Sequence, residues 1–166
     1  MLVAMLVAVV AILAPLAWWL GRMGHEVLLV ERAPALRTGG FVLNLWGLGY
    51  DAVERMGLLP RLLELQHHSD ELRMVDRAGR TRGGYPSSVL LRLAGGRMAT
   101  LARSDIAAAI FASLDDRVET RFGDGIAAID DDGVRARIAF EHSDSREVDL
   151  VVGADGMHSR VRQLVF

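Results

Sequence analysis

The sequence DLVVGADGMHSRVR, residues 149–162, leads from an apolar run through a glycine-containing turn into a polar segment. The apolar run predicts a buried strand, and the residues after Gly156 predict the start of a helix. Glycines at such a turn let the backbone approach a ligand closely, and the N–H groups of a helix N-terminus bind phosphate oxygens. The same spacing is typical of a tight turn in which Asp155 caps the helix, so the residues alone leave both interpretations open.

Outside this stretch, predicted strands and helices alternate along the chain. The run EVLLV, residues 26–30, predicts a strand buried on both faces of a parallel sheet. Turn glycines between residues 71 and 98 predict two or three antiparallel strands, and residues 103–114 predict a helix with Ser104 as its N-cap. This order predicts an α/β fold with an antiparallel insertion. No segment resembles a linker, so residues 1–166 are expected to form a single domain.

The composition narrows the classes of function. The 166 residues are 51% hydrophobic and 24% charged, which is typical of a globular chain. A net charge of −2 argues against nucleic acid as a partner. The absence of cysteine excludes a thiolate metal site and a thiol nucleophile, and it fits the reducing cytoplasm. His67, His68 and Asp70 are adjacent but do not supply three or four convergent ligands, so no metal site is predicted.

The first twenty residues, MLVAMLVAVVAILAPLAWWL, carry no charge and no glycine and allow two interpretations. Their length satisfies the threshold for a transmembrane helix, which would anchor the chain in a membrane. The alternative is the first strand and helix of an α/β domain. A signal peptide is disfavoured, because no charged residue precedes the apolar run and no clear cleavage site follows it.

The Asp-Gly stretch resembles the second fingerprint of FAD-dependent monooxygenases of the p-hydroxybenzoate hydroxylase type. In that family an apolar strand is followed in order by two small residues, Asp-Gly, a polar residue, Ser and Arg. The matching residues here are Gly153, Ala154, Asp155, Gly156, His158, Ser159 and Arg162. Two further stretches are similar to this family: WLGRMGHEVLLVERAPALRTGG, residues 19–40, to its first helix, second strand and following loop, and LARSDIAAAI, residues 101–110, to a helix start.

The resemblance implies a Rossmann-like FAD-binding domain of the glutathione-reductase type and assigns four cofactor contacts. Glu31 would bind the adenosine ribose, Arg32 would lie along the adenine, and Arg103 would reach the pyrophosphate or ribityl chain. Asp155 would contact FAD and the nicotinamide cofactor. For Glu31 the spacing agrees independently, because an acid at the end of the second strand, about 20 residues after the glycine turn, accepts ribose hydroxyls.

The first glycine motif of this family is missing. A dinucleotide fold needs G-x-G-x-x-G between its first strand and helix, so that the backbone can touch the pyrophosphate. One alignment places these positions at Ala8, Val10 and Leu13, and the other places them at Val7, Val9 and Ile12. A side chain at the second position occupies space that the phosphate needs, so we expect weak or absent FAD binding.

Together these observations predict the N-terminal, truncated part of a FAD-binding domain. The whole family member would hydroxylate a small aromatic or polyketide substrate in the cytoplasm with NAD(P)H and O2, whereas this chain alone would be inactive. The catalytic residues stay unassigned, because the flavin performs the chemistry in this family. The alternative is a non-catalytic domain that is a remnant of this fold or is anchored in a membrane by residues 1–20.

Overall fold

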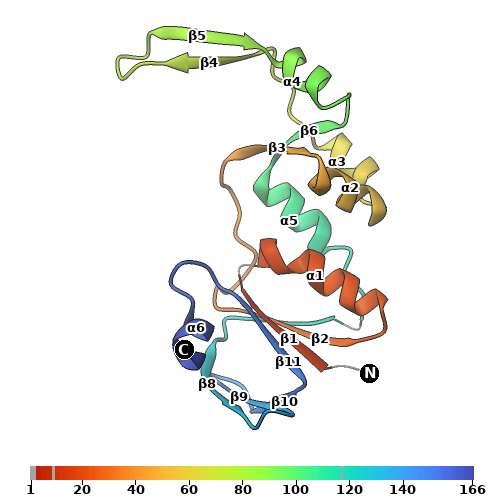
Figure 1. The fold of residues 1–166 in the computed structure, drawn as a ribbon, viewed down its shortest axis with the longest axis vertical. Helices are drawn as coiled ribbons and strands as arrows, with labels where there is room; N and C mark the ends of the chain where they lie inside the picture. Colours follow the sequence, from red (N-terminus) through yellow and green to blue (C-terminus); the bar gives the residue numbers. More distant parts are fainter. Residues whose placement is uncertain (1–2, 9, 117) are drawn as a thin grey trace. The chain divides into compact units, whose positions relative to one another are not determined.

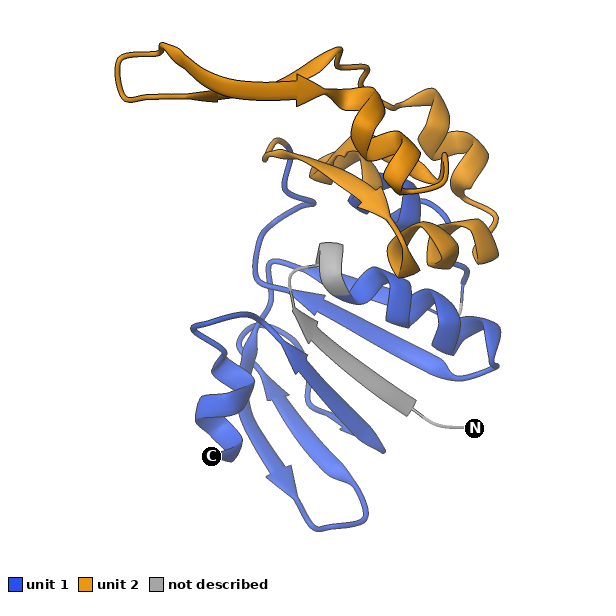
Figure 2. Cartoon of the chain, turned by 45° about the horizontal axis from the view of Figure 1, so that its top comes forward, with its two compact units in different colours: residues 1–38, 107–166 blue, residues 39–106 orange. Residues whose placement is uncertain are grey.

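The structure is a computed structural model that describes residues 3–8, 10–116 and 118–166. For residues 3–8 and 10–12 it describes the backbone alone. The chain divides into two compact units, drawn in different colours in Figure 2. Unit 1 comprises residues 1–38 and 107–166, and unit 2 comprises residues 39–106. A single domain over residues 1–166 stays a prediction.

Unit 1 is built on a four-stranded parallel sheet with the strand order β11-β1-β2-β7. Helix α1 (Val10–Arg22) connects β1 to β2, which forms a βαβ unit. Parallel strands present all their carboxyl ends at one edge of the sheet, so loops that follow different strands meet there. The strands are β1 (Val3–Ala8), β2 (Glu26–Glu31), β7 (Val118–Phe122) and β11 (Leu150–Ala154).

A second, antiparallel sheet packs on one face of this parallel sheet (Figure 1). Leu28 and Val30 of β2 share a buried cluster with Ile138 and other residues of the antiparallel sheet. Because side chains alternate along a strand, Val27 and Leu29 point to the opposite face, where α1 packs against β2. Both faces of β2 are therefore covered, which explains its apolar sequence. The antiparallel strands are β8 (Ile126–Asp131), β9 (Ala136–Phe140) and β10 (Arg146–Val148).

Unit 2 contains two antiparallel strand pairs and three short helices. In the first pair β3 (Val42–Trp46) runs against β6 (Met98–Ala102), and Leu101 on this pair is fully buried. The second pair is a hairpin of β4 (Glu71–Val75) and β5 (Thr81–Pro86). The helices are α2 (Leu48–Arg55), α3 (Leu59–Glu64) and α4 (Ser87–Leu93).

Helices α5 (Arg103–Phe111) and α6 (Arg160–Val165) are the other two described helices, and only α5 crosses the boundary between the units. Helix α5 starts in unit 2 and ends in unit 1, where the rings of Phe111 and Phe122 lie 5.6 Å apart. Helix α6 follows β11 at the end of the chain. The prediction of Ser104 as an N-cap was wrong, because α5 already begins at Arg103 and Ser104 lies inside its first turn.

Two other local predictions differ from the structure. Residues 71–98 contain α4 as well as the antiparallel hairpin, because Pro86 provides an extended residue before the apolar SSVLLRL segment, and that segment forms a helix. Strand β11 is only half-buried, with Leu150 and Gly153 exposed, because it lies at the edge of the sheet and pairs on one side with β1. The mixed α/β class itself is confirmed.

The interpretation of residues 1–20 as one transmembrane helix was wrong. These residues contribute strand β1 and most of helix α1, which has 13 residues. A helix of this length spans about 20 Å, whereas a bilayer core is about 30 Å thick. Within the part of the chain that the structure describes, no helix is long and apolar enough to cross a membrane.

Candidate functional site

The carboxyl edge of the parallel sheet brings two of the predicted site residues to neighbouring strands. Strand β1 lies between β11 and β2, with Ala8 opposite Ala154 and Val7 opposite Val30. Asp155 and Glu31 therefore come directly after these register positions, one on each side of the end of β1. Strand β1 ends at Ala8, and residue 9, which follows it, lies outside the described residues.

Glu31 is the last residue of β2, and its side chain is buried, with 7% of the residue exposed. Its carboxylate oxygen Oε1 accepts a hydrogen bond from the Ala33 N–H at 2.9 Å, which holds the carboxylate at the end of the strand. The Glu31 carbonyl oxygen also accepts from the Asp124 N–H at 3.4 Å. An ordinary charged strand end would point into solvent, so the burial of Glu31 distinguishes it from that interpretation.

Arg32 follows Glu31 and forms an ion pair with Glu141. The Arg32 side chain is 67% exposed, and its Nη2 lies 3.2 Å from Glu141 Oε1 and 3.4 Å from Oε2. Glu141 is not predicted from the sequence, because 109 positions separate it from Arg32 and it belongs to no motif.

Asp155 caps the start of helix α6. Its Oδ1 accepts a hydrogen bond from Ser159 Oγ at 2.5 Å, and its Oδ2 accepts from the backbone N–H groups of Arg160 at 2.5 Å and Val161 at 3.2 Å. The capping interpretation that the spacing left open is therefore present in the structure. A cofactor contact of Asp155 stays a prediction.

The turn between β11 and α6 is built by Ser159, Gly156 and Arg162. Ser159 is the N-cap, and its Oγ accepts from the Arg162 N–H at 3.0 Å. Gly156 has φ of 84°, a conformation that residues with a side chain rarely adopt. The Arg162 guanidinium donates to the Met157 carbonyl at 2.6 Å and so ties the helix back to the turn.

These contacts also control the charge of Asp155. Partial burial raises the pKa of a carboxyl group, but the hydrogen bonds from Ser159, Val161 and Arg160 to Asp155 outweigh this effect. The pKa of Asp155 is therefore lowered from its ordinary value, and the group is an anion at neutral pH.

Arg103, the fourth predicted residue, belongs to unit 2. It is the first residue of α5 and is half-buried. Its backbone N–H donates to the Phe41 carbonyl at 3.2 Å, which joins the start of the helix to the segment that precedes β3. Its predicted contact with a pyrophosphate or ribityl chain stays a prediction.

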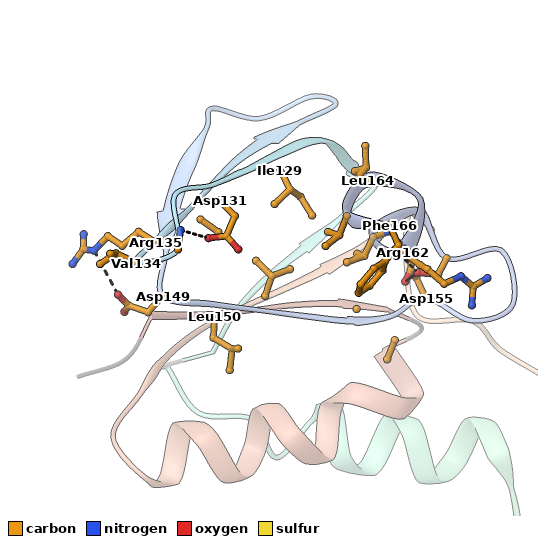
Figure 3. A pocket seen from close by; sticks show the side chains of 18 of the residues that line it. Ile129, Asp131, Val134, Arg135, Asp149, Leu150, Asp155, Arg162, Leu164 and Phe166 are labelled. Carbon is orange, nitrogen blue, oxygen red and sulfur yellow. Dashed lines mark hydrogen bonds and ion pairs between the residues drawn. The ribbon is translucent and has the colours of Figure 1, made fainter.

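A pocket of about 970 Å³ lies between β11, α6 and the β8–β9 hairpin of unit 1 (Figure 3). Its polar wall contains the capping residues Asp155 and Ser159 together with Arg162. At another part of the wall, Arg135 Nε lies 3.6 Å from Asp149 Oδ1. The remaining wall is largely apolar and includes Ile129, Val134, Leu150, Val151, Val161, Leu164, Val165 and Phe166.

No group of three or more histidines, aspartates or glutamates suited to a metal ion occurs among residues 3–8, 10–116 and 118–166. The polar groups of the candidate site in unit 1 are the carboxylates of Glu31 and Asp155, the guanidinium groups of Arg32 and Arg162, the Ser159 hydroxyl and backbone N–H groups. Such groups recognise hydroxyl and phosphate groups of a ligand.

The residues at this edge fit only part of a dinucleotide. The acid at the end of β2 suits a ribose, and Gly156 in the Asp-Gly turn has a positive φ of 84°. The connection from β1 to α1 contains no glycine at Ala8 or Val10, and Leu13 is buried with 4% exposed. Val9 and the side chains at positions 7, 8, 10 and 12 lie outside the described residues. The weak FAD binding that the missing glycines predict stays a prediction.

Comparisons with known proteins agree with this fold. The uncharacterized protein Rv1260 of Mycobacterium tuberculosis (strain ATCC 25618 / H37Rv) is 40% identical over 162 residues, which cover 90% of this chain and 41% of that protein. The FAD-dependent monooxygenase asL4 of Sarocladium schorii is 31% identical over 155 residues, with coverage of 90% and 36%.

Among solved structures, p-nitrophenol 4-monooxygenase PnpA from Pseudomonas putida DLL-E4 superposes with a TM-score of 0.79 at 20% identity, over 99% of this chain and 44% of that one. No protein-family model matches the chain. The chain thus spans well under half the length of these three proteins.

The chain has a mixed α/β fold, which it shares with the monooxygenase PnpA. Within that class, the chain is homologous to the FAD-dependent monooxygenases, whose aromatic hydroxylases have the same fold. The resemblance based on the Asp-Gly motif is confirmed.

Proposed function

We propose that this chain is the FAD-binding portion of a flavin-dependent monooxygenase that hydroxylates a small aromatic or polyketide substrate. NAD(P)H and O2 would be the co-substrates, and the protein would work in the cytoplasm, where NAD(P)H is present. The proposal is supported by homology to a FAD-dependent monooxygenase and by the shared fold of PnpA, whose name states an aromatic substrate, p-nitrophenol. In these relatives, the regions outside the aligned part would complete the substrate site.

One observation carries the proposal: Glu31 is the last residue of β2 and Asp155 directly follows β11, the two strands that flank β1, at the carboxyl edge of a parallel sheet. In open α/β sheets, ligands bind outside the carboxyl ends of the strands. We infer that the β1–α1–β2 segment is a Rossmann-like nucleotide unit.

Each residue has a distinct role in this proposal. The buried Glu31 carboxylate would accept ribose hydroxyls, Arg32 would lie beside the adenine, and Arg103 would approach the pyrophosphate or ribityl chain. Asp155 would act through the turn: by capping α6 it fixes the backbone of the Asp-Gly segment against FAD and the nicotinamide.

The absence of glycine from the sequence between β1 and α1 predicts weak FAD binding, because any side chain at the second motif position would take up space that the pyrophosphate needs. The combined substitutions Ala8→Gly and Val10→Gly should increase FAD affinity, measured as quenching of flavin fluorescence on titration with protein. Leu13 should be left unchanged, because removing this buried side chain would cost about 2–5 kcal/mol of stability.

The control adds Gly57→Ala to the same double variant. Gly57 lies in unit 2 and has a φ of 73°, so alanine at this position is strained and lowers stability. The control therefore measures how far a general loss of stability changes FAD binding when the residues between β1 and α1 are the same. No gain in binding by a folded double variant would contradict the proposal. That result would favour the second candidate, a non-catalytic remnant of the fold, which the missing glycines also suggest.

A further inference from the structure

We propose that Glu141 is a positioning residue for Arg32 and makes the carboxyl end of β2 select an adenosine ribose without a 2′-phosphate. This inference rests on the proposed nucleotide function of the sheet edge. It assigns the selectivity to a residue far from Glu31 and Arg32 in the sequence.

The two residues at the end of β2, Glu31 and Arg32, favour different ligands. An acid at this position accepts the hydroxyls of an unphosphorylated ribose, whereas a nearby arginine accommodates a 2′-phosphate. This chain has both, because Glu31 and Arg32 are consecutive. Their order alone cannot tell which one governs, so the choice depends on what holds the guanidinium.

Glu141 holds it. Arg32 Nη2 contacts both carboxylate oxygens of Glu141, at 3.2 and 3.4 Å. The Glu141 side chain is the more sheltered partner, at 31% exposed against 67% for Arg32. The carboxylate is therefore the fixed member of the pair, and the long arginine side chain is the member that it positions.

Gly125 provides the space that this carboxylate occupies. A Cβ atom at position 125 would lie 2.8 Å from Glu141 Oε2 and 2.9 Å from its Cδ, closer than real Cβ atoms approach other atoms. Gly125 is not among the glycines with positive φ, so its backbone conformation does not require glycine. The Glu141 carboxylate, which packs against position 125, is the reason that a residue without a side chain fits there.

The backbone around Glu141 is anchored on the same segment. The Glu141 N–H donates to the Gly125 carbonyl at 2.8 Å. The buried Asp124 carboxylate accepts from the backbone N–H groups of Gly125 at 2.8 Å and His142 at 3.0 Å, and from Ser143 Oγ at 2.5 Å. These contacts lock residues 124–125 to residues 141–143, so the position of Glu141 is set by the fold.

This arrangement disfavours a phosphate at the ribose. A 2′-phosphate would have to take the Arg32 guanidinium from Glu141 and approach two carboxylates, Glu31 and Glu141, which repel it. A ribose hydroxyl needs no such exchange, because it can donate to a carboxylate directly.

The test compares ADP-ribose with 2′-phospho-ADP-ribose, two probes that differ by one phosphate group. Their dissociation constants are measured by isothermal titration calorimetry with the full chain and with the Ala8→Gly, Val10→Gly variant. The chain should prefer ADP-ribose. Glu141→Gln should reduce this preference roughly two- to fivefold, the range of one exposed ion pair.

Three further variants sharpen the result. Gly125→Ala should act like Glu141→Gln, because its Cβ displaces the carboxylate. In an Arg32→Ala background, Glu141→Gln should change the preference far less. Glu64→Gln removes the ion pair that Glu64 forms with Arg61 in unit 2, and should leave the preference unchanged.

The outcomes separate this inference from the function on which it rests. If both probes bind and Glu141→Gln, folded by circular dichroism, keeps the full preference, the role of Glu141 is wrong and the nucleotide site stands. If neither probe binds to either form of the chain, the proposed function fails and the inference fails with it.

Discussion

At the scale of single residues, Asp155 shows how a motif residue can have a structural role that its motif does not state. Both carboxylate oxygens accept hydrogen bonds from the first turn of α6 or from its N-cap, Ser159. The carboxylate also lies at the positive end of the helix, where an anion is stabilised. Any contact with a cofactor would be added to this cap.

The cap makes stability depend on pH. Because the pKa of Asp155 in the folded chain is below its ordinary value of about 3.9, its contribution is present above that value and is lost as the pH falls through the folded pKa. Asp155→Asn should lower the free energy of unfolding at pH 7 by about 0.5–2 kcal/mol. In urea unfolding, the difference from wild type should shrink below about pH 4.

The matched control is Asp130→Asn, which changes an exposed aspartate on β8. This substitution should alter the free energy of unfolding by no more than about 0.5 kcal/mol at either pH. An Asp155→Asn difference that stays constant from pH 7 to pH 3 would rule out the charged cap as its source.

At the scale of elements, the close packing of α6 on β11 decides where the Asp-Gly turn lies. A Cβ atom at Gly153 would lie 2.7 Å from both Cβ and Cγ1 of Val161, so the helix passes directly over the strand at this glycine. Gly153 does not have a positive φ, which means that its small size is what the packing uses. The same closeness shapes one wall of the pocket between β11, α6 and β8–β9.

Gly153→Ala should therefore force α6 away from β11 and lower the free energy of unfolding by about 1–3 kcal/mol, measured by urea denaturation. The matched control is Gly83→Ala, where the added Cβ would meet only Met74 Cε, at 3.1 Å. That atom is the end of a flexible side chain and can move, so the control should cost clearly less. Equal losses in the two variants would contradict the packing argument.

At the scale of the whole molecule, unit 2 is inserted between two segments of unit 1. Each unit contains fully buried side chains, such as Leu62 in unit 2 and Ile138 in unit 1. Regions with their own buried side chains can open separately, with different free energies.

Leu62→Ala should cost about 2–5 kcal/mol locally, because it leaves a cavity in unit 2. Native-state hydrogen exchange should then speed up for amides of residues 39–106 more than for those of β2 and β9. Val134→Ala, at an exposed position of unit 1, serves as the control and should leave both sets unchanged. An equal loss of protection in both units would instead support the single cooperative domain that the sequence predicts.

Several features of the fold and site could be predicted from the sequence. The apolar run of β2 predicted a strand with both faces covered. From position 153, the order of small residues, Asp-Gly, Ser and Arg indicated the relationship to FAD-dependent monooxygenases. The missing glycines before position 14 were likewise visible in the letters. These signals are local, because they depend on residues that are neighbours in the chain.

Only the tertiary structure decided how the site residues are held. Length and hydropathy could not tell a membrane helix from β1 and α1, because both are apolar and pairing of β1 with β2 and β11 is a long-range event. Likewise, the ion pair joins Arg32 to Glu141, which lies 109 positions further along the chain, and the Glu141 carboxylate packs against Gly125. Periodic patterns in the sequence cannot predict contacts between such distant residues. The sequence determined the family and the strand ends; the packing of distant segments determined what each charged group touches.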